Sequence, residues 1–321
     1  MRKSSVAEAS ESRTQQPVAS PATEISSLAS KKPRSLWSDA WRTFRRHRLA
    51  LLGTFVIVTL LLVTAIGPFF REMSAIDFTS STQAPSLSHP FGTDDLGRDI
   101  MARVFWGGRV SLSVGVVAVV IAISLGTLIG AVSGFFGGFM DSALMRFTDM
   151  AISLPILPLL LLCSYLFRDS LTARFGTPLG PFILVVGLIG VLSWMPVARL
   201  VRASFLSVKE KEFIEAAYCI GASRSSIIFR HILPNTIGPV IVAATIGIGS
   251  AIITESSLSF LGLGFPPDTP TWGRLLFDGR NYMDFASWFV IFPGLAIFLS
   301  VLSINYIGDG LRDAFDPRRT M

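Results

Sequence analysis

The residues between positions 207 and 234 form the most specific chemical pattern of the chain. Glu215-Ala216-Ala217 is followed by Gly221 and, after nine residues, by His231-Ile232-Leu233-Pro234. The apolar positions before Gly221 recur at helical spacing, which predicts a short helix with one apolar and one charged face: Phe213, Ala216, Ala217 and Ile220. A helix of this kind can bind its own membrane domain or a partner protein.

Local signals predict the ends of this helix. Ser207-Val208-Lys209-Glu210 has the capping-box pattern, so we expect the helix to begin at Ser207. Gly221 should follow its end, because glycine adopts a positive φ at little cost. We expect a second short helix from Ser223 to about Leu233, broken at Pro234.

Patterns for catalysis or nucleotide binding do not occur in the sequence. It contains no G-x-x-x-x-G-K-[ST] phosphate loop, no H-E-x-x-H zinc pattern and no G-x-S-x-G nucleophile elbow. His47, His89 and His231 lie in separate loops, and Cys163 and Cys219 are too few for a metal site. We therefore expect no enzyme activity, and no cofactor or metal in this chain; if ATP drives its function, separate subunits bind ATP and Mg²⁺.

Other charged residues have two interpretations each. A cluster before position 110 either contacts an external protein or forms an ion-pair network in a folded loop: Asp94, Asp95, Arg98 and Asp99. Glu255 is expected where an apolar stretch ends, either lining an external gate or making a structural hydrogen bond. Arg146 and Asp149 are three residues apart on one helical face, where they either form a local ion pair at the membrane interface or belong to a gate or substrate contact.

Six stretches without Asp, Glu, Lys, Arg or His must position these groups. They are 18 to 31 residues long: 49–70, 110–140, 150–167, 175–198, 232–254 and 285–308. A helix needs about 20 residues to cross a bilayer, whereas a barrel strand needs about 10 of alternating character. Half of the 321 residues are hydrophobic and 16% are charged, against about 25% in soluble domains. The pattern predicts an all-α membrane protein with six transmembrane helices and excludes an ordinary soluble enzyme.

The basic residues indicate the orientation. Seventeen of the 28 Lys and Arg lie in 31–48, in the loop 199–231, at Arg146 and in the C-terminal tail. By the positive-inside rule these segments, and both termini, are cytoplasmic. The net charge of +6 therefore reflects topology, and we expect no nucleic-acid partner. The first apolar stretch is too long and too far from the start for a cleaved signal peptide.

The chain divides into consecutive segments on this interpretation. They are a disordered cytoplasmic tail (1–35), an N-terminal region with the first helix (36–70), an external loop (71–109), a five-helix core (110–308) and a cytoplasmic tail (309–321). The core contains the cytoplasmic loop 199–235. Its first helix carries glycines at 126, 130, 134 and 138, a spacing that allows close helix packing within the chain or with another subunit.

The pattern from Glu215 to Pro234 resembles the EAA loop of ABC importer permeases. In that family the loop forms a coupling helix that seats in a groove of the cytoplasmic ATPase. The resemblance therefore implies an ATPase-coupling role for Glu215, Ala216, Ala217, Gly221, Leu233 and Pro234. The usual pattern has Ile where His231 stands, and His is familiar in the peptide-importer branch.

A second resemblance extends over residues 35–319. His89 to Asp99, followed by Gly108 to Leu112, resembles the segment before helix two in peptide and nickel importer permeases, particularly the C-type subunit. Three further segments match that pattern: Leu36 to Arg48, Ser257 to Gly264 and Pro270 to Gly273. The family implies the type I permease fold, a second permease as heterodimer partner, two cytoplasmic ATP-binding subunits and an external substrate-binding protein.

These observations predict a permease subunit that imports di- or oligopeptides across the bacterial cytoplasmic (inner) membrane. Within the branch, nickel or another small solute is the alternative cargo. A secondary transporter driven by an ion gradient is the alternative of a different class; it predicts an ionisable residue well inside a helix. A structural membrane protein would leave the Ser207–Pro234 loop unexplained.

Overall fold

The computed structural model describes residues 36–71, 73 and 76–315. The chain divides after Asp39, and the second unit, which begins at Ala40, holds every helix from α3 onward. The predicted tail 1–35 and the end of the predicted tail 309–321 lie outside the described residues. The start of that second tail is helical, because the last helix continues to Phe315.

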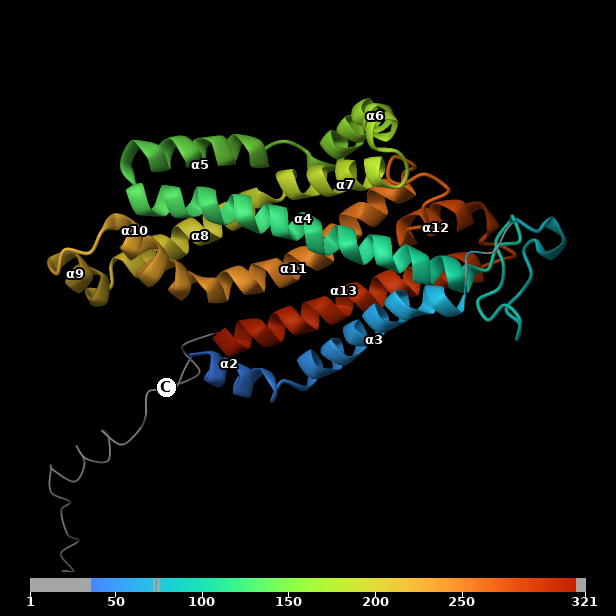
Figure 1. Ribbon diagram of the computed structural model, residues 1–321, viewed down its shortest axis with the longest axis horizontal. Helices are drawn as coiled ribbons and strands as arrows, with labels where there is room; N and C mark the ends of the chain where they lie inside the picture. The colour runs from blue at the N-terminus through green and yellow to red at the C-terminus, as the bar shows by residue number, and fades with distance from the viewer. Residues whose placement is uncertain (1–35, 72, 74–75, 316–321) are drawn as a thin grey trace, which may run out of the picture. The chain divides into compact units, whose positions relative to one another are not determined.

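The described residues form helices joined mostly by short loops, with one long connection between α3 and α4 (Figure 1). The elements are α2 (Leu36–Phe44), α3 (Arg48–Phe70), η1 (Phe78–Ser80), α4 (Ile100–Phe136), α5 (Gly138–Ile152), α6 (Ile156–Phe175), α7 (Leu179–Leu192), α8 (Trp194–Lys209), α9 (Glu212–Cys219), α10 (Arg224–Ser226), the π-helical turn η2 (Ile227–Ile232), α11 (Leu233–Phe260), α12 (Trp272–Gly279), η3 (Arg280–Tyr282) and α13 (Trp288–Phe315). In this part of the chain six helical segments are long and apolar enough to cross a membrane: α3, α4, α6, α7–α8, α10–α11 and α13. The predicted all-α fold with six transmembrane helices is confirmed.

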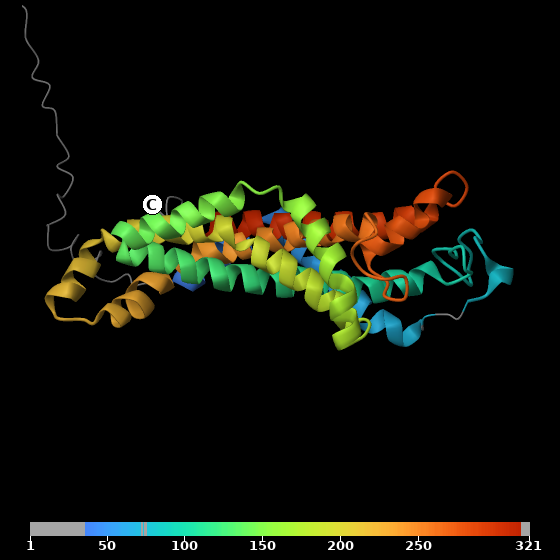
Figure 2. The same ribbon diagram turned by 90° about the horizontal axis from the view of Figure 1, so that it is seen from above.

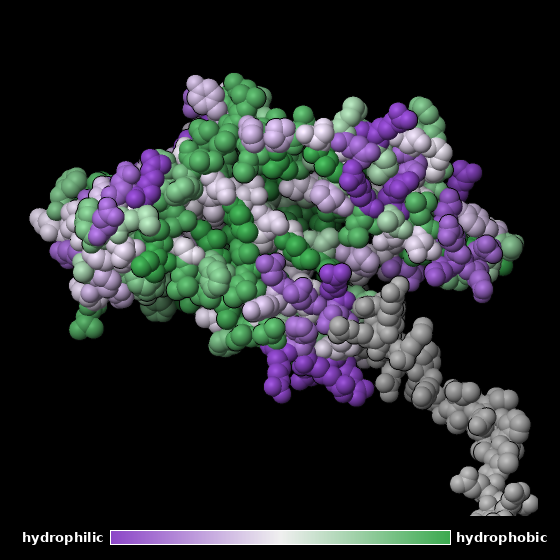
Figure 3. Space-filling model, turned by 180° about the vertical axis from the view of Figure 1, so that it is seen from behind, coloured by the Kyte–Doolittle hydropathy of each residue, from purple (hydrophilic) through white to green (hydrophobic). Residues whose placement is uncertain are grey.

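The long helices lie roughly along one direction and leave two distinct ends. Figures 1 and 2 both place α9 and α10 at one end, here called the α9 end, and α12 with the loop 76–99 at the other, the α12 end. Helix α3 packs along α13, and α13 packs on α11, whereas α4 contacts α7, α8 and α11. A broad hydrophobic area extends over one face, with clusters of hydrophilic side chains at its borders (Figure 3).

The glycines of α4 allow its close contact with α8. A Cβ atom at Gly130 would lie 2.4 Å from the carbonyl oxygen of Ala198, and one at Gly134 would lie 2.7 Å from Cβ of Phe205. Gly126 approaches Val197 and the carbonyl of Trp194 in the same way. Three of the four predicted glycines therefore serve packing within the chain, while Gly138 begins α5 with φ +56°.

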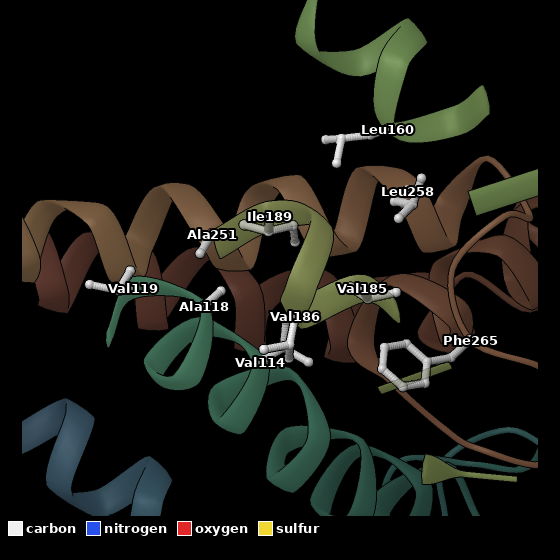
Figure 4. Packing of buried hydrophobic residues seen from close by; sticks show 10 residues of the cluster. All are labelled: Val114, Ala118, Val119, Leu160, Val185, Val186, Ile189, Ala251, Leu258 and Phe265. Carbon is white, nitrogen blue, oxygen red and sulfur yellow. The ribbon is translucent and has the colours of Figure 1, made fainter. Parts of the chain in front are cut away.

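A cluster of buried aliphatic residues joins four helices in the middle of the bundle (Figure 4). Val114 and Ala118 of α4 pack with Val185 and Ile189 of α7. Leu160, Ala251, Leu258 and Phe265 complete the contact from α6, α11 and the loop that follows. Because lipid gives helices little hydrophobic reason to associate, small and β-branched residues with close complementarity hold them together.

An arginine compensates for a proline in α3. Pro68 lies inside that helix and has no N–H to donate to the carbonyl of Thr64, four residues earlier. Nε of Arg109 on α4 donates to this carbonyl oxygen at 2.9 Å, and Nη2 donates to that of Ala65 at 2.5 Å. The guanidinium therefore ties α3 to α4 and satisfies the carbonyl that proline leaves open.

Several predicted boundaries differ from the structure. Helix α4 begins at Ile100, so the last ten residues of the predicted external loop 71–109 are helical, and their arginines are paired rather than solvated. The predicted span 150–167 is interrupted at Ser153–Pro155, between α5 and α6. The span that continues from there, Ile156–Phe175, includes the charged residues Arg168 and Asp169.

The ends of the helices in the segment 199–235 were also predicted wrongly. Helix α8 continues through Ser207 to Lys209, because its apolar face still packs there, with Phe205 buried and Val208 half-buried; α9 begins only at Glu212. Burial thus outweighs the local capping box. Pro234 does not break the helix either: it lies in the first turn of α11, directly after the π-helical turn η2, and the helical segment continues through it.

Candidate functional sites

Helix α9 is fixed to the bundle by one face. The side chains of Ile214 and Ala217 are buried among residues of α8 and η2, including Phe205, Ile227 and Ile232. Of the predicted apolar face, Ala217 is buried against the chain's own bundle, whereas Phe213, Ala216 and Ile220 are exposed. The buried face fixes the position of α9, and a second apolar stripe is left uncovered.

The exposed stripe carries most of the predicted coupling residues. Glu215, Ala216, Gly221 and Pro234 are exposed, and Leu233 is half-buried. The large side chains around them are open too: Phe213 is 46% exposed, Tyr218 44%, Ile220 85% and Phe229 66%. Phe213, Tyr218 and Ile220 lie outside the six candidate spans, and exposed aromatic and aliphatic side chains at such a place are typical of a protein–protein contact.

Gly221 ends α9 as predicted. Its φ is +80°, its N–H donates to the carbonyl of Tyr218 at 3.0 Å, and the N–H of Ala222 donates to that of Ala217 at 3.0 Å. This pair of hydrogen bonds is the Schellman arrangement, which requires the left-handed conformation that glycine adopts most easily. The turn sends the chain back into η2, where one wide turn of π-helix leads into α11.

Two ion pairs fasten α5 to α8 beside this surface. Nε and Nη2 of Arg202 donate to the two carboxylate oxygens of Asp141, at 2.5 and 2.6 Å. These hydrogen bonds hold the pKa of the Asp141 carboxyl below its usual value. Asp149 accepts from Arg199 at 2.5 Å, so the predicted Arg146–Asp149 pair is replaced by one with the neighbouring helix.

At the α12 end, Asp94 is the centre of a buried charge network. Its side chain is fully buried, and Oδ2 accepts from Nε of Arg98 and from Nη1 of Arg103, both at 2.7 Å. Oδ1 accepts the backbone N–H groups of Leu96 and Arg98. Nη2 of Arg103 donates to Asp278 on α12 at 3.2 Å. The network therefore connects the loop, α4 and α12.

The other predicted residues of this cluster also have partners within the chain. Asp99 is almost fully buried, accepts the N–H of Ala102 at the start of α4 and pairs with Arg71 and with His89. Asp95 accepts a hydrogen bond from the hydroxyl of Tyr282 at 3.2 Å, and its charge raises the pKa of that hydroxyl. The structure shows the ion-pair network in a folded loop, and contact of these residues with an external protein stays a prediction.

Glu255 lies inside α11 rather than at its end. The helix continues to Phe260, and the carboxylate is fully buried. It accepts hydrogen bonds from the hydroxyls of Ser111 at 3.0 Å and Ser259 at 2.8 Å. The Ser111 oxygen in turn accepts the backbone N–H of Trp272, in the first turn of α12, at 3.2 Å. Glu255 therefore joins α4, α11 and α12 through hydrogen bonds, and its role at an external gate stays a prediction.

A cavity of about 490 Å³ lies between the two ends. Helices α4 and α11 line it together with the interruptions between α5 and α6 and between α7 and α8. Sequence analysis missed this cavity, because it depends on two helix breaks that meet in space. The prolines at 155 and 196 were the signal that could have indicated both breaks.

The described residues contain no cluster of three or more His, Cys, Asp or Glu side chains that could hold a metal ion.

Sequence analysis also missed Arg103, Asp278 and Ser111 as members of the networks. Asp278 had a local signal, since it follows Arg274 by one helical turn and pairs with it at 2.8 Å.

Comparison with known proteins identifies related sequences over nearly the whole chain. Residues 126–321 match the family described as binding-protein-dependent transport system inner membrane component, and residues 35–85 match the N-terminal transmembrane domain of oligopeptide transport permease C. A dipeptide transport system permease protein of Alkalihalophilus pseudofirmus is 39% identical over 88% of this chain and 90% of the relative. An oligopeptide transport system permease protein of Haemophilus influenzae is 38% identical over 89% of each chain. A glutathione transport system permease protein of Escherichia coli is 40% identical over 89% of this chain and 91% of the relative.

Proposed function

Because the chain belongs to the family of binding-protein-dependent transport system inner membrane components, we propose that it is the C-type permease subunit of an ABC importer for short peptides. The observation that carries this proposal is the surface of α9. This helix is anchored by Ile214 and Ala217 and leaves Phe213, Ala216 and Ile220 exposed at one end of a six-span bundle. A surface built in this way receives a partner without losing its own position.

The partners of this chain follow from the roles of the separate subunits in such an importer. Separate cytoplasmic subunits bind ATP and Mg²⁺, and their closure on nucleotide moves α9. A second, related permease completes the passage through the membrane, and an external binding protein delivers the cargo. This chain contributes the coupling surface and one wall of the passage, and catalyses no reaction itself.

The α9 end is the cytoplasmic end in this proposal. Basic residues in the elements next to α9 support the orientation by the positive-inside rule: Lys209 at the end of α8, Arg224 in α10 and Arg230 in η2. The α12 end then faces the external binding protein, and both termini of the chain are cytoplasmic. The membrane is the bacterial inner membrane.

Peptides are the cargo that the relatives support. The named relatives carry dipeptides, oligopeptides and glutathione, which is itself a tripeptide, so we place this chain in the short-peptide branch. Nickel or another small solute remains the alternative cargo. Uptake of a labelled tripeptide and of ⁶³Ni²⁺ by the same proteoliposomes separates the two.

The coupling role is tested in proteoliposomes that contain the whole complex and its binding protein. Glu215→Ala and Gly221→Val should assemble normally but import peptide roughly tenfold more slowly per ATP hydrolysed, the effect of losing about 1.4 kcal/mol of coupling. Glu210→Ala, which removes the same charge just before α9, is the matched control and should leave the ratio unchanged.

The coupling role is contradicted if Glu215→Ala and Gly221→Val both import peptide at the wild-type rate per ATP hydrolysed. Peptide uptake by proteoliposomes that lack the ATP-binding subunits would instead favour transport driven by an ion gradient. The amount of permease recovered with its partners is measured in each preparation, so that loss of assembly is not mistaken for loss of coupling.

A further inference from the structure

The cavity between the two helix breaks lies on the side of the bundle away from α3. The helices around it are α4, α5–α6, α7–α8 and α11, while α3 and α13 contribute no lining residue. Its volume of about 490 Å³ falls within the range of about 300–1,000 Å³ that is usual for small-molecule sites.

Interrupted backbone lines this cavity. Leu154 lies in the break between α5 and α6, and Ser193 lies in the break between α7 and α8. Pro196, also in the lining, cannot donate to the carbonyl of Leu192. Non-helical backbone at membrane depth is tolerated where it is buried in protein or lines a cavity that supplies partners. Residues of both breaks therefore contribute to the cavity wall.

The side chains of the lining carry no charge. Most are aliphatic, and three carry hydroxyl groups: Ser193, Ser250 and Thr254. Ser250 and Thr254 are one turn apart on α11 and donate to the carbonyls of Ile246 at 3.3 Å and of Ser250 at 2.8 Å. Their oxygens remain free to accept a hydrogen bond. For the Ser193 hydroxyl no hydrogen bond is found within the described part of the chain.

We propose that this cavity is the place where peptide cargo contacts this subunit during transport, and that it holds the peptide backbone without sensing side-chain charge. The proposal rests on the function proposed above. A peptide has amide N–H donors for the row of hydroxyls and side chains for the aliphatic wall. A lipid acyl chain cannot hydrogen-bond with the hydroxyls. A bare cation would need charged ligands in place of the water molecules of its hydration shell.

An uncharged cavity wall is also suited to the transport of peptides. Transport requires a contact that is favourable enough for the cargo to enter and weak enough for it to leave. A buried charge in the wall would retain peptides of the opposite sign and exclude peptides of the same sign. With Ser250 and Thr254 in its place, cationic and anionic peptides meet the same wall, and selection is left to the binding protein.

The test introduces a charge and measures selectivity. In the complete complex, Ser250→Asp should raise the ratio of cationic to anionic tripeptide uptake by roughly tenfold, and Ser250→Lys should lower it by a similar factor. The two tripeptides differ only in a central Lys or Glu, and uptake is normalised to occupancy of the unchanged binding protein. Ser250→Ala should leave the ratio at the wild-type value.

Ser257→Asp is the matched control. Ser257 lies two turns along α11, its hydroxyl donates to the carbonyl of Ile253 at 2.8 Å as that of Ser250 does to Ile246, and it lies outside this cavity. The proposal is overturned if Ser250→Asp changes both uptakes by one factor, or if Ser257→Asp shifts the ratio equally. A wild-type complex that imports neither peptide would overturn the proposed function instead.

A thiol probe covers the case in which the charged variants do not assemble. In a Ser250→Cys complex, saturating peptide and binding protein should slow maleimide labelling at position 250 during ATP turnover. Ser257→Cys should be labelled at the same rate with and without peptide. Equal protection at both positions, or at neither, overturns the proposal.

Discussion

At the α12 end, Asp94 and Arg103 are buried and paired, whereas at the α9 end Glu215 is exposed and has no ion pair within the described residues. The loop 76–99 is irregular, yet buried carboxylates fix it against α4 and α12. Helix α9 is regular, yet six of its eight residues are exposed. Regular secondary structure therefore does not indicate which end of the molecule has its polar side chains paired within the chain and which end leaves side chains exposed.

The difference separates two uses of polar residues. Buried pairs such as Asp94–Arg103 are costly unless every donor and acceptor is satisfied, so they specify one arrangement of their helices. Exposed residues such as Phe213 and Glu215 add little to stability and remain available to a partner. Substitutions at the α12 end should affect folding, and those on the open face of α9 should affect coupling.

The largest effect is expected for Asp94→Ala. It leaves the guanidinium of Arg103 buried with only Asp278 as its carboxylate partner, and it should cost about 3–5 kcal/mol of unfolding free energy. Thermal unfolding and yield of the detergent-solubilised permease pair measure this loss. Asp284→Ala, at an exposed position of the same end, should change neither quantity. Equal unfolding free energies for Asp94→Ala and Asp284→Ala would contradict the view that the buried ion pairs stabilise the α12 end.

A smaller loss is expected for Glu255→Ala. The hydroxyls of Ser111 and Ser259 would lose their acceptor, at a cost of about 1–3 kcal/mol. Limited proteolysis of the loop that follows α12 should become faster, because the first turn of α12 is held through Ser111. Unchanged proteolysis would show that α12 is held by the Asp278 network alone.

A loss of about 1–1.5 kcal/mol is expected for Arg109→Ala, which removes the donor to the carbonyl of Thr64. In a Pro68→Ala background the N–H of Ala at position 68 can donate to the Thr64 carbonyl itself. Arg109→Ala should therefore cost less unfolding free energy in that background than in the wild type. A double-mutant cycle on the unfolding midpoint measures the coupling. Additive effects would mean that Arg109 acts independently of Pro68.

The smallest effect on stability is expected for Phe213→Ala, within about 0.5 kcal/mol, because the side chain is exposed. Its neighbour Ile214 is fully buried, and Ile214→Ala should cost about 2–5 kcal/mol. Phe213→Ala should nevertheless lower peptide import per ATP hydrolysed. Normal coupling in Phe213→Ala would show that the Phe213 side chain is not part of the partner contact.

The sequence was sufficient for the features that local composition determines. Charge-free stretches located six membrane spans, and Gly221 located the end of α9 because a single backbone conformation requires it. The basic residues of α4 misled the prediction, since Arg103 finds a partner at Asp278, 175 residues away. A partner at that separation leaves no mark on local composition, and the same holds for Glu255 and Ser111.

The contact between α4 and α8 has a mechanical consequence. At Gly126, Gly130 and Gly134 the two helices meet almost backbone to backbone, with no long side chains of α4 between them. Long side chains can absorb a small displacement by changing rotamer, but a glycine has none to change. Helix α8 leads through a short turn into α9, and both α4 and α8 border the cavity. The contact is therefore stiff, and a shift imposed on α9 reaches the cavity wall with little loss of amplitude.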